Sequence, residues 1–375
     1  MKFGSGYSKT LDSAQAAIES VEKALEESGE PSLTFLITTE FYDHNVVFKS
    51  VKNLVGDSKI LGFCSGGIIT PEGLFTRGIG ACTLSGKKIR VKTSLQKNIE
   101  DNPRLAGEKA GKELLSAGID TGTVFVFPDG AAANIPDLVQ GLYNHMGPDF
   151  QYVGGGSAFN TYQVTEKGVE KGGLATALVE GIDIKTGIGH GWQPKTDPMI
   201  ITRSNGKKIH EINGIPAFDA YCGQINDMSA EKFEFTRMKY PLGFPDISGN
   251  YLIREPFTLN PDKSMDLVTE IPQNAVGNVM ESEISDLIEN MGKILLEIGE
   301  IEKTDFVIIF DCIGRYLFMG DEFHKELEVI TESIGQNVPL LGALTFGEVG
   351  SYIDVPLLHN KTTVILGCKF ASEKR

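Results

Sequence analysis

Three segments of the sequence follow one plan, and this internal repeat constrains the fold more than any other feature. Each segment has an amphipathic helix, an apolar strand, a second helix, a strand that runs into a glycine-bearing turn, and a last strand. The first helices and strands are SAQAAIESVEKALEES with SLTFLITT, LAGEKAGKELLSAG with TVFVFPDG, and SEISDLIENMGKILLEIG with DFVIIFDCIGR. We therefore expect an α/β fold of three αβαββ-like repeats, with mixed sheets that carry helices. A layered α/β/β/α sandwich is one arrangement that fits.

The strand-to-turn elements align on a glycine that is followed three residues later by a hydroxyl side chain. The aligned pairs are Gly62 with Ser65, Gly154 with Ser157, and Gly342 with Thr345. Neither a dinucleotide-binding fingerprint nor a phosphate loop occurs there, and no helix follows the run YVGGGSAFN. The run therefore indicates strand-exit geometry first. Gly154, Ser157 and Asn160 also remain candidates for a wall that faces a ligand.

The segment between the second and third repeats has a different character. MIITRSNGKKIHEING is typical of a hairpin, with Asn205-Gly206 as its tight turn. MKYPLGFPDISGNYLIREPF follows it and contains three prolines. We place a domain boundary near Asp219, which gives one domain of residues 1–218, with two repeats and the hairpin linker, and another of residues 219–375, with the third repeat. A chain of 375 residues is consistent with two domains.

Charge and cysteine usage exclude several classes of protein. The formal net charge of −15 opposes binding to a phosphate backbone, and no basic patch offsets it. The five cysteines form no C-x-x-C pair, which argues against a disulfide framework or a structural zinc site. No secretory signal and no apolar run of about 18–20 residues is present. We expect a soluble, cytoplasmic protein without nucleic-acid or membrane partners.

A set of short stretches resembles the FIST sensory-domain family. The stretches are GFCSGG, GHGWQP, EINGIPAFDAY, YPLGF, YLIREPF, FDCIGR, GEVG and HNKTTVI, in the order that the family has them. The resemblance implies an N and a C domain, a role in intracellular signal transduction, and binding of a small ligand such as an amino acid. Some relatives use haem to sense nitric oxide. Where the family's N-domain turn usually carries an acid this chain has Ile68, while the equivalent acid of the C half, Glu348, is present.

The resemblance also implies a stand-alone receptor, or one that acts on a signalling output protein, because repeat and hairpin segments account for nearly all of the chain. Its oligomeric state is left open by the sequence.

Arg315 and Glu348 are the pair that we expect to hold a small zwitterion in the C domain. Arg315 follows a buried strand, where its guanidinium could clamp a carboxylate. Glu348 follows Gly347 in a glycine-bearing loop and could receive an ammonium group. Both lie at strand ends, where α/β sheets tend to place ligands. The alternatives are a salt bridge to a surface acid for Arg315 and a solvated loop acid for Glu348.

The remaining candidates carry weaker signals. His359 could be an axial haem ligand, a proton switch or a turn residue that bonds its own backbone, and we favour the turn. Cys312 and Ser65 lie at strand exits, but the sequence shows no base for either as a nucleophile. The predicted ligand-binding residues are Arg315, Glu348, Gly347, Cys312, His359, Asn360, Ser65, Gly154, Ser157 and Asn160.

These signals favour a binding protein without catalytic residues, metal or cofactor. A haem-based gas sensor, and a hydrolase that uses a strand-exit serine or cysteine, stay as alternatives.

Overall fold

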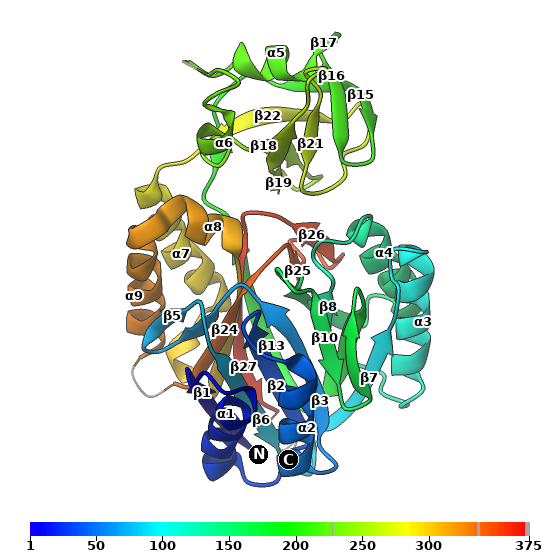
Figure 1. The fold of residues 1–375 in the computed structure, drawn as a ribbon, viewed down its shortest axis with the longest axis vertical. Helices are drawn as coiled ribbons and strands as arrows, with labels where there is room; N and C mark the ends of the chain where they lie inside the picture. Colours follow the sequence, from blue (N-terminus) through cyan, green and yellow to red (C-terminus); the bar gives the residue numbers. More distant parts are fainter. Residues whose placement is uncertain (227, 336–337, 372–375) are drawn as a thin grey trace.

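The computed structural model describes residues 1–226, 228–335 and 338–371, and it confirms the three repeats (Figure 1). Each repeat has an additional strand at its start and a short hairpin after its turn. The first repeat comprises β1 (Lys2–Ser8), α1 (Ser13–Ser28), β2 (Leu33–Thr39), α2 (His44–Val55), β3 (Lys59–Ser65), β4 (Ile68–Thr70), β5 (Gly73–Phe75) and β6 (Ile79–Ser85). The second comprises β7 (Arg90–Gln96), α3 (Pro103–Leu115), β8 (Gly122–Pro128), α4 (Ile135–Met146), β9 (Phe150–Gly155), β10 (Tyr162–Thr165), β11 (Gly168–Lys171) and β12 (Leu174–Glu180).

The third repeat is interrupted after its first strand. It comprises β13 (Ile182–Gly189), α7 (Ile284–Ile298), η1 (Ile301–Lys303), β23 (Phe306–Cys312), α8 (Ile313–Met319), η2 (Gly320–Glu322), α9 (Phe323–Ile334), β24 (Leu340–Thr345), β25 (Glu348–Gly350), β26 (Leu357–His359) and β27 (Thr363–Phe370). Together the three repeats form the three-sheet body, residues 2–189 and 284–370.

The three sheets exchange their hairpins in a closed ring. The sheet orders are β1-β6-β2-β3-β10-β11, β7-β12-β8-β9-β25-β26 and β13-β27-β23-β24-β4-β5. In each sheet four strands come from one repeat and a two-stranded hairpin comes from another. The first repeat therefore gives its hairpin to the third, the third to the second, and the second to the first. This exchange ties the repeats into one body.

The inner faces of the three sheets share one hydrophobic core. Phe35 packs edge-on against Phe125 at 4.8 Å between ring centroids, and Phe127 lies 5.5 Å from Phe310. These rings come from three different sheets, and such aromatic pairs add to the stability gained by burial. Helices cover the outer faces, with α1 and α2, α3 and α4, and α7 and α9 on successive sheets (Figure 1). Any two sheets thus show the expected α/β/β/α layering, and the third sheet closes the arrangement.

The helix ends follow from the local sequence. Asp43 caps α2 by accepting hydrogen bonds from the backbone N–H groups of Asn45 and Val46. The second helix of each repeat ends at a glycine with positive φ, as the sequence predicts. These glycines are Gly56 (φ 58°), Gly147 (φ 88°) and Gly335 (φ 82°).

Residues 193–281 form a separate unit, which we call the upper unit, above the three-sheet body in Figure 1. It comprises β14 (Gln193–Pro194), β15 (Met199–Asn205), β16 (Lys208–Ile212), β17 (Ile215–Pro216), α5 (Ala217–Cys222), α6 (Phe233–Thr236), β18 (Leu242–Pro245), β19 (Tyr251–Arg254), β20 (Pro256–Leu259), β21 (Met265–Leu267) and β22 (Val276–Glu281). Its strands form one antiparallel sheet, and the hairpin β15–β16 turns at Gly206 as expected.

The upper unit is inserted within the third repeat and does not lie between repeats two and three. β13 precedes it in sequence, yet β13 pairs with β27 in the third sheet. The sequence did not reveal this because β13 pairs with a strand almost 180 residues later. The boundary that we place near Asp219 falls in α5, inside this unit, and stays a prediction. None of the helices in the described residues is long and apolar enough to cross a bilayer.

Candidate functional site

The three aligned strand exits meet near the centre of the three-sheet body. The ends of paired parallel strands place Thr39 beside Ser65, Asp129 beside Ser157, and Cys312 beside Thr345. This register confirms the alignment of the three turns. It also makes Cys312 the counterpart, in the third repeat, of Thr39 and Asp129.

The glycine run is used for close backbone packing at this meeting point. A Cβ atom on Gly154, which has φ +153°, would lie 2.1 Å from the carbonyl oxygen of Val126. A Cβ on Gly155 would lie 2.4 Å from Cγ2 of Thr345. A side chain at Gly154 would overlap β8, and a side chain at Gly155 would overlap β24. Gly154 therefore has a structural role, and the first reading of the run, strand-exit geometry, fits its surroundings.

The hydroxyl groups of this region are also engaged within the protein. The Ser65 hydroxyl lies 2.9 Å from the carbonyl oxygen of Gly67, and Ser157 Oγ accepts a hydrogen bond of 2.7 Å from Gln163. Both serines are fully buried. Asn160 donates to the carbonyl oxygen of Glu40 at 3.2 Å, away from the cavities that we describe next. The structure gives these three residues partners within the chain.

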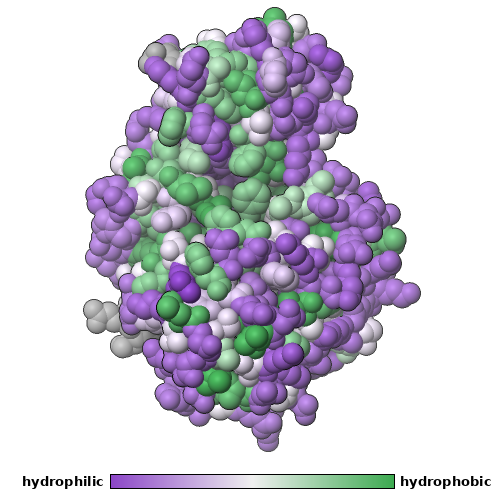
Figure 2. Space-filling model, in the orientation of Figure 1, coloured by the Kyte–Doolittle hydropathy of each residue, from purple (hydrophilic) through white to green (hydrophobic). Residues whose placement is uncertain are grey.

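A cavity of about 60 Å³ lies between the three-sheet body and the upper unit, and we call it the waist cavity. Its walls are formed by Arg237, Met238, Glu255, Phe257, Val268, Cys312, Ile313, Gly314, Leu317, Phe346, Gly347 and Asn360. Phe257 and Leu317 are about half exposed. Figure 2 shows hydrophobic surface gathered at the same waist, between the two parts of the molecule. The cavity is therefore lined mainly by apolar side chains, with Arg237, Glu255 and Asn360 among its polar residues.

Two buried polar atoms of opposite hydrogen-bonding character occur in the walls of the waist cavity. Arg237 is 4% exposed and Asn360 is 3% exposed, and in the described part of the chain the Arg237 Nε–H donor and the Asn360 Oδ1 acceptor have no hydrogen-bond partner. An unsatisfied buried polar group costs about 1–3 kcal/mol. A guest that accepts from Arg237 and donates to Asn360 would recover this energy.

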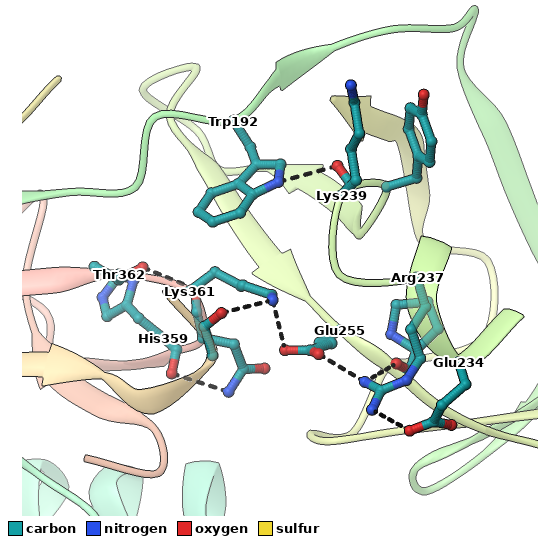
Figure 3. A network of polar contacts seen from close by, with 12 residues as sticks. Trp192, Glu234, Arg237, Lys239, Glu255, His359, Lys361 and Thr362 are labelled. Atoms are coloured by element: carbon teal, nitrogen blue, oxygen red, sulfur yellow. Dashed lines mark hydrogen bonds and ion pairs between the residues drawn. The ribbon is translucent and has the colours of Figure 1, made fainter. Parts of the chain in front are cut away.

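An ion network connects the two parts of the molecule beside the cavity (Figure 3). Glu255 of the upper unit accepts from Arg237 at 2.7 Å and from Lys361 of the body at 3.2 Å. Lys361 is fully buried, donates to the carbonyl oxygen of Gly314 at 3.2 Å, and lies 5.4 Å from the ring centroid of Trp192. Trp192 in turn donates from its indole nitrogen to the carbonyl oxygen of Lys239.

Cys312 lines the cavity, and Glu348 lies behind its wall. Burial raises the pKa of the Cys312 thiol well above its usual value, and the charge of Glu348 acts in the same direction. Burial also raises the pKa of Glu348, although hydrogen bonds from Thr345 Oγ1 (2.8 Å) and from the backbone N–H of Thr362 (3.4 Å) favour its carboxylate. Glu348 is therefore a buried acid beside a thiol, which differs from the solvated loop acid considered above.

Arg315 has a different environment from the one that a ligand clamp requires. Its guanidinium is fully buried and bonds Glu326 at 2.7 Å, Asp311 at 3.1 Å and the carbonyl oxygen of His190 at 2.6 Å. Burial and the neighbouring charge of Glu326 raise the pKa of Asp311. Arg315 therefore makes salt bridges with two buried acids, and not with the surface acid that was the alternative to a ligand clamp.

His359 and His190 both make hydrogen bonds within the protein. His359 is fully buried, its Nε2 lies 3.2 Å from the carbonyl oxygen of Gly350, and burial lowers its pKa to about 3. His190 lines an open groove of about 480 Å³, and its Nδ1 accepts from the backbone N–H of Trp192. His359 Nδ1 has no hydrogen-bond partner among the described residues, but its ring is fully buried.

Of the ten predicted ligand-binding residues, the structure places Cys312, Gly347 and Asn360 in the wall of the waist cavity. Glu348 and His359 lie behind the wall. The sequence did not identify Arg237, Glu255 or Lys361 as residues of this region. Glu255 lies in YLIREPF and Lys361 in HNKTTVI, and a charged residue inside a stretch of the family resemblance was the signal available for these two.

Comparison with known proteins finds two family models that meet inside the upper unit. A model of the FIST N domain matches residues 32–215, and a model of the FIST C domain matches residues 217–351. The chain belongs to the FIST family. FIST domains are sensory domains of signal transduction proteins.

Other similarities to this FIST protein are weaker. The uncharacterized protein MJ1623 of Methanocaldococcus jannaschii is 23% identical over 150 residues, which is 36% of this chain and 29% of that protein. The match thus spans less than a third of the relative's length. The structure of PurLQS from Thermotoga maritima aligns with 99% of this chain and 72% of that one, at 8% identity and a TM-score of 0.23. That value carries no argument about fold or function.

Proposed function

We propose that this FIST protein is a sensory receptor that binds an amino acid or a similar small metabolite in the waist cavity. The observation that supports it best is a pair of atoms without a partner among the described residues, Arg237 Nε–H and Asn360 Oδ1, on two residues that line the same cavity from opposite parts of the chain. An α-amino acid carries a carboxylate that accepts from the guanidinium and an ammonium group that donates to the amide oxygen.

The size of the cavity sets the size of the ligand. A water molecule needs about 10–15 Å³ of such space, so 60 Å³ corresponds to roughly four to six water-sized positions. Glycine and alanine fall in that range. Larger ligands would have to extend past Phe257 and Leu317 at the rim.

The position of the cavity is suited to a sensor. Its walls come from both parts of the chain, with Arg237 and Val268 from the upper unit and Cys312 and Asn360 from the body. A ligand that contacts both parts favours the arrangement in which both walls are in place. Binding would thereby change how firmly the upper unit is held, which is a signal that an output partner can read.

Isothermal titration calorimetry of the full chain with glycine, alanine and larger amino acids tests the proposal. We expect saturable binding of at least one small amino acid. Arg237→Lys keeps a positive charge for Glu255 but removes the Nε–H, so affinity should fall about tenfold or more. Asn360→Leu should weaken binding by a similar factor. Unchanged affinity in both variants, with both folded, would refute the site.

A further inference from the structure

The walls of the waist cavity leave two side-chain atoms for a guest to bond. Arg237, Glu255 and Asn360 are the wall residues that have side-chain nitrogen or oxygen atoms. Arg237 Nη1 and Nη2 donate to Glu255 at 2.7 Å and to Glu234 at 3.2 Å. The second oxygen of Glu255 pairs with Lys361, and Asn360 Nδ2 donates to a backbone carbonyl oxygen at 3.0 Å. Of these wall atoms, Arg237 Nε–H and Asn360 Oδ1 have no partner among the described residues.

In the proposed binding mode, the α-carbon end of the ligand uses both of these atoms. The carboxylate of the amino acid accepts from Arg237, and its ammonium group donates to Asn360. The side chain of the ligand then meets wall atoms that already have partners. A hydroxyl, amide or charged group in that position gives up hydration without a hydrogen bond in return. Polar side chains on the ligand are therefore disfavoured.

Most other side chains of the walls are apolar, and they come from both parts of the chain. The upper unit and the body contribute three each: Met238, Phe257, Val268, Ile313, Leu317 and Phe346. Phe257 and Leu317 are about half exposed, so a ligand side chain that packs on them removes apolar surface from water. Such a side chain also contacts the upper unit and the body at once.

We propose that the waist cavity selects amino acids with a small apolar side chain over their polar counterparts, and that Leu317 at the rim sets this preference. The inference rests on the proposed function, because the cavity must bind the carboxylate and the ammonium group first. The volume of about 60 Å³ holds the α-carbon end of the ligand, and the side chain extends toward the rim. Alanine, 2-aminobutyrate and valine have this form.

Two pairs of ligands with equal shape test the selection on the full chain. Valine and threonine differ by a methyl group against a hydroxyl group, and 2-aminobutyrate and serine differ in the same way. Calorimetry should show that the apolar member of each pair that binds does so about tenfold more tightly than the polar member. Aspartate and lysine should bind more weakly than the apolar ligands.

Leu317→Asn tests whether the rim sets the preference. Leu317 is about half exposed on α8, so the substitution adds an amide group to the rim without opening the core. The ratio of affinities within each pair should fall from about ten toward one. Leu296→Asn is the matched control, because Leu296 is exposed on α7 and does not line the cavity, so the ratio should stay at the wild-type value. Phe257 is left unchanged, because its ring centroid lies 5.1 Å from the guanidinium carbon of Arg237 and its loss would also disturb the carboxylate site.

The outcomes separate this inference from the proposed function. Equal affinities within both pairs, together with weaker binding in Arg237→Lys, overturn the selection and leave ligand binding in the cavity in place. A preference that persists in Leu317→Asn overturns the role of Leu317. If no amino acid binds the wild-type chain, the proposed function and the inference fall together. The comparison within the wild type decides the selection even if a variant does not fold.

Discussion

Arg315 shows how buried charges are held in this molecule. It lies between Asp311 and Glu326 with no exposed side-chain surface. Removing one member of such a cluster leaves uncompensated charge in a medium of low dielectric constant. The sequence predicted that Arg315 follows a buried strand, but it could not predict its partners. Glu326 lies eleven residues away on α9, and only the folded chain brings the two together.

Arg315→Met is therefore expected to lower the free energy of unfolding by about 3–5 kcal/mol. The matched control is Lys293→Met, which breaks an exposed pair with Glu289 and should cost at most about 1 kcal/mol. Urea denaturation of both variants measures the difference. Equal and small losses in the free energy of unfolding would show that Arg315 does not compensate the charges of Asp311 and Glu326.

The buried histidines predict a loss of stability in acid. Burial lowers the pKa of His359 to about 3, while an unfolded histidine titrates near 6.5. Below pH 6.5 the unfolded chain binds a proton that the folded chain does not, so stability falls as pH falls toward 3. One such group contributes about 2 kcal/mol between pH 7 and pH 5.

Urea unfolding of His359→Gln at pH 7 and pH 5 should therefore show a smaller acid loss than the wild type, by about that amount. His190, whose pKa burial lowers to about 4, continues to contribute in the variant. An unchanged pH dependence would mean that His359 is protonated in the folded state.

The exchanged hairpins are the feature that turns three repeats into one body. The sequence predicted the helices, the parallel strands and the glycine turns, because each has a local pattern. It did not predict β1 and β13 as first strands, or the destination of β4, β10 and β25. Such pairings join segments far apart in the chain, and a strand of three or four residues has too few side chains to specify its partner.

Gly154→Ala tests the close packing at the strand exits. Its Cβ would lie 2.1 Å from the Val126 carbonyl oxygen, so we expect a loss of at least about 2 kcal/mol. Gly29→Ala is the control, because Gly29 also has positive φ but no atom within 4 Å of an added Cβ. That variant should lose only about 1 kcal/mol. Similar losses in the free energy of unfolding at both sites, measured by thermal or urea unfolding, would show that the Val126 carbonyl oxygen moves away from the added Cβ at little cost.

At the scale of the whole molecule, the upper unit and the body meet at a cavity that neither could form alone. The contacts that join the upper unit to the body include the ion pair of Lys361 with Glu255. They also include the hydrogen bond of 3.3 Å from Arg254 Nη1 to the carbonyl oxygen of Leu358. The sequence predicted three residues of the cavity wall, Cys312, Gly347 and Asn360, whereas its domains of residues 1–218 and 219–375 do not correspond to the body and the upper unit. It could not predict the wall contributed by Arg237 and Val268, because the insertion brings them into place only in the folded chain.

Ligand binding should therefore stabilise the whole chain against heat. At a ligand concentration one hundred times Kd, the gain is about 2.7 kcal/mol. Val268→Trp places a large ring in the cavity and keeps the charged side chains of the ion network, so it should abolish the shift in Tm while leaving the protein folded. A shift that survives this substitution would locate the ligand elsewhere.

A crystal structure of the full chain with a bound small amino acid tests the central claim most directly. The account predicts ligand density in the waist cavity, with the carboxylate against Arg237 Nε and the ammonium group against Asn360 Oδ1. Density in the groove lined by His190 and Tyr352 instead, with only water in the waist cavity, would contradict it.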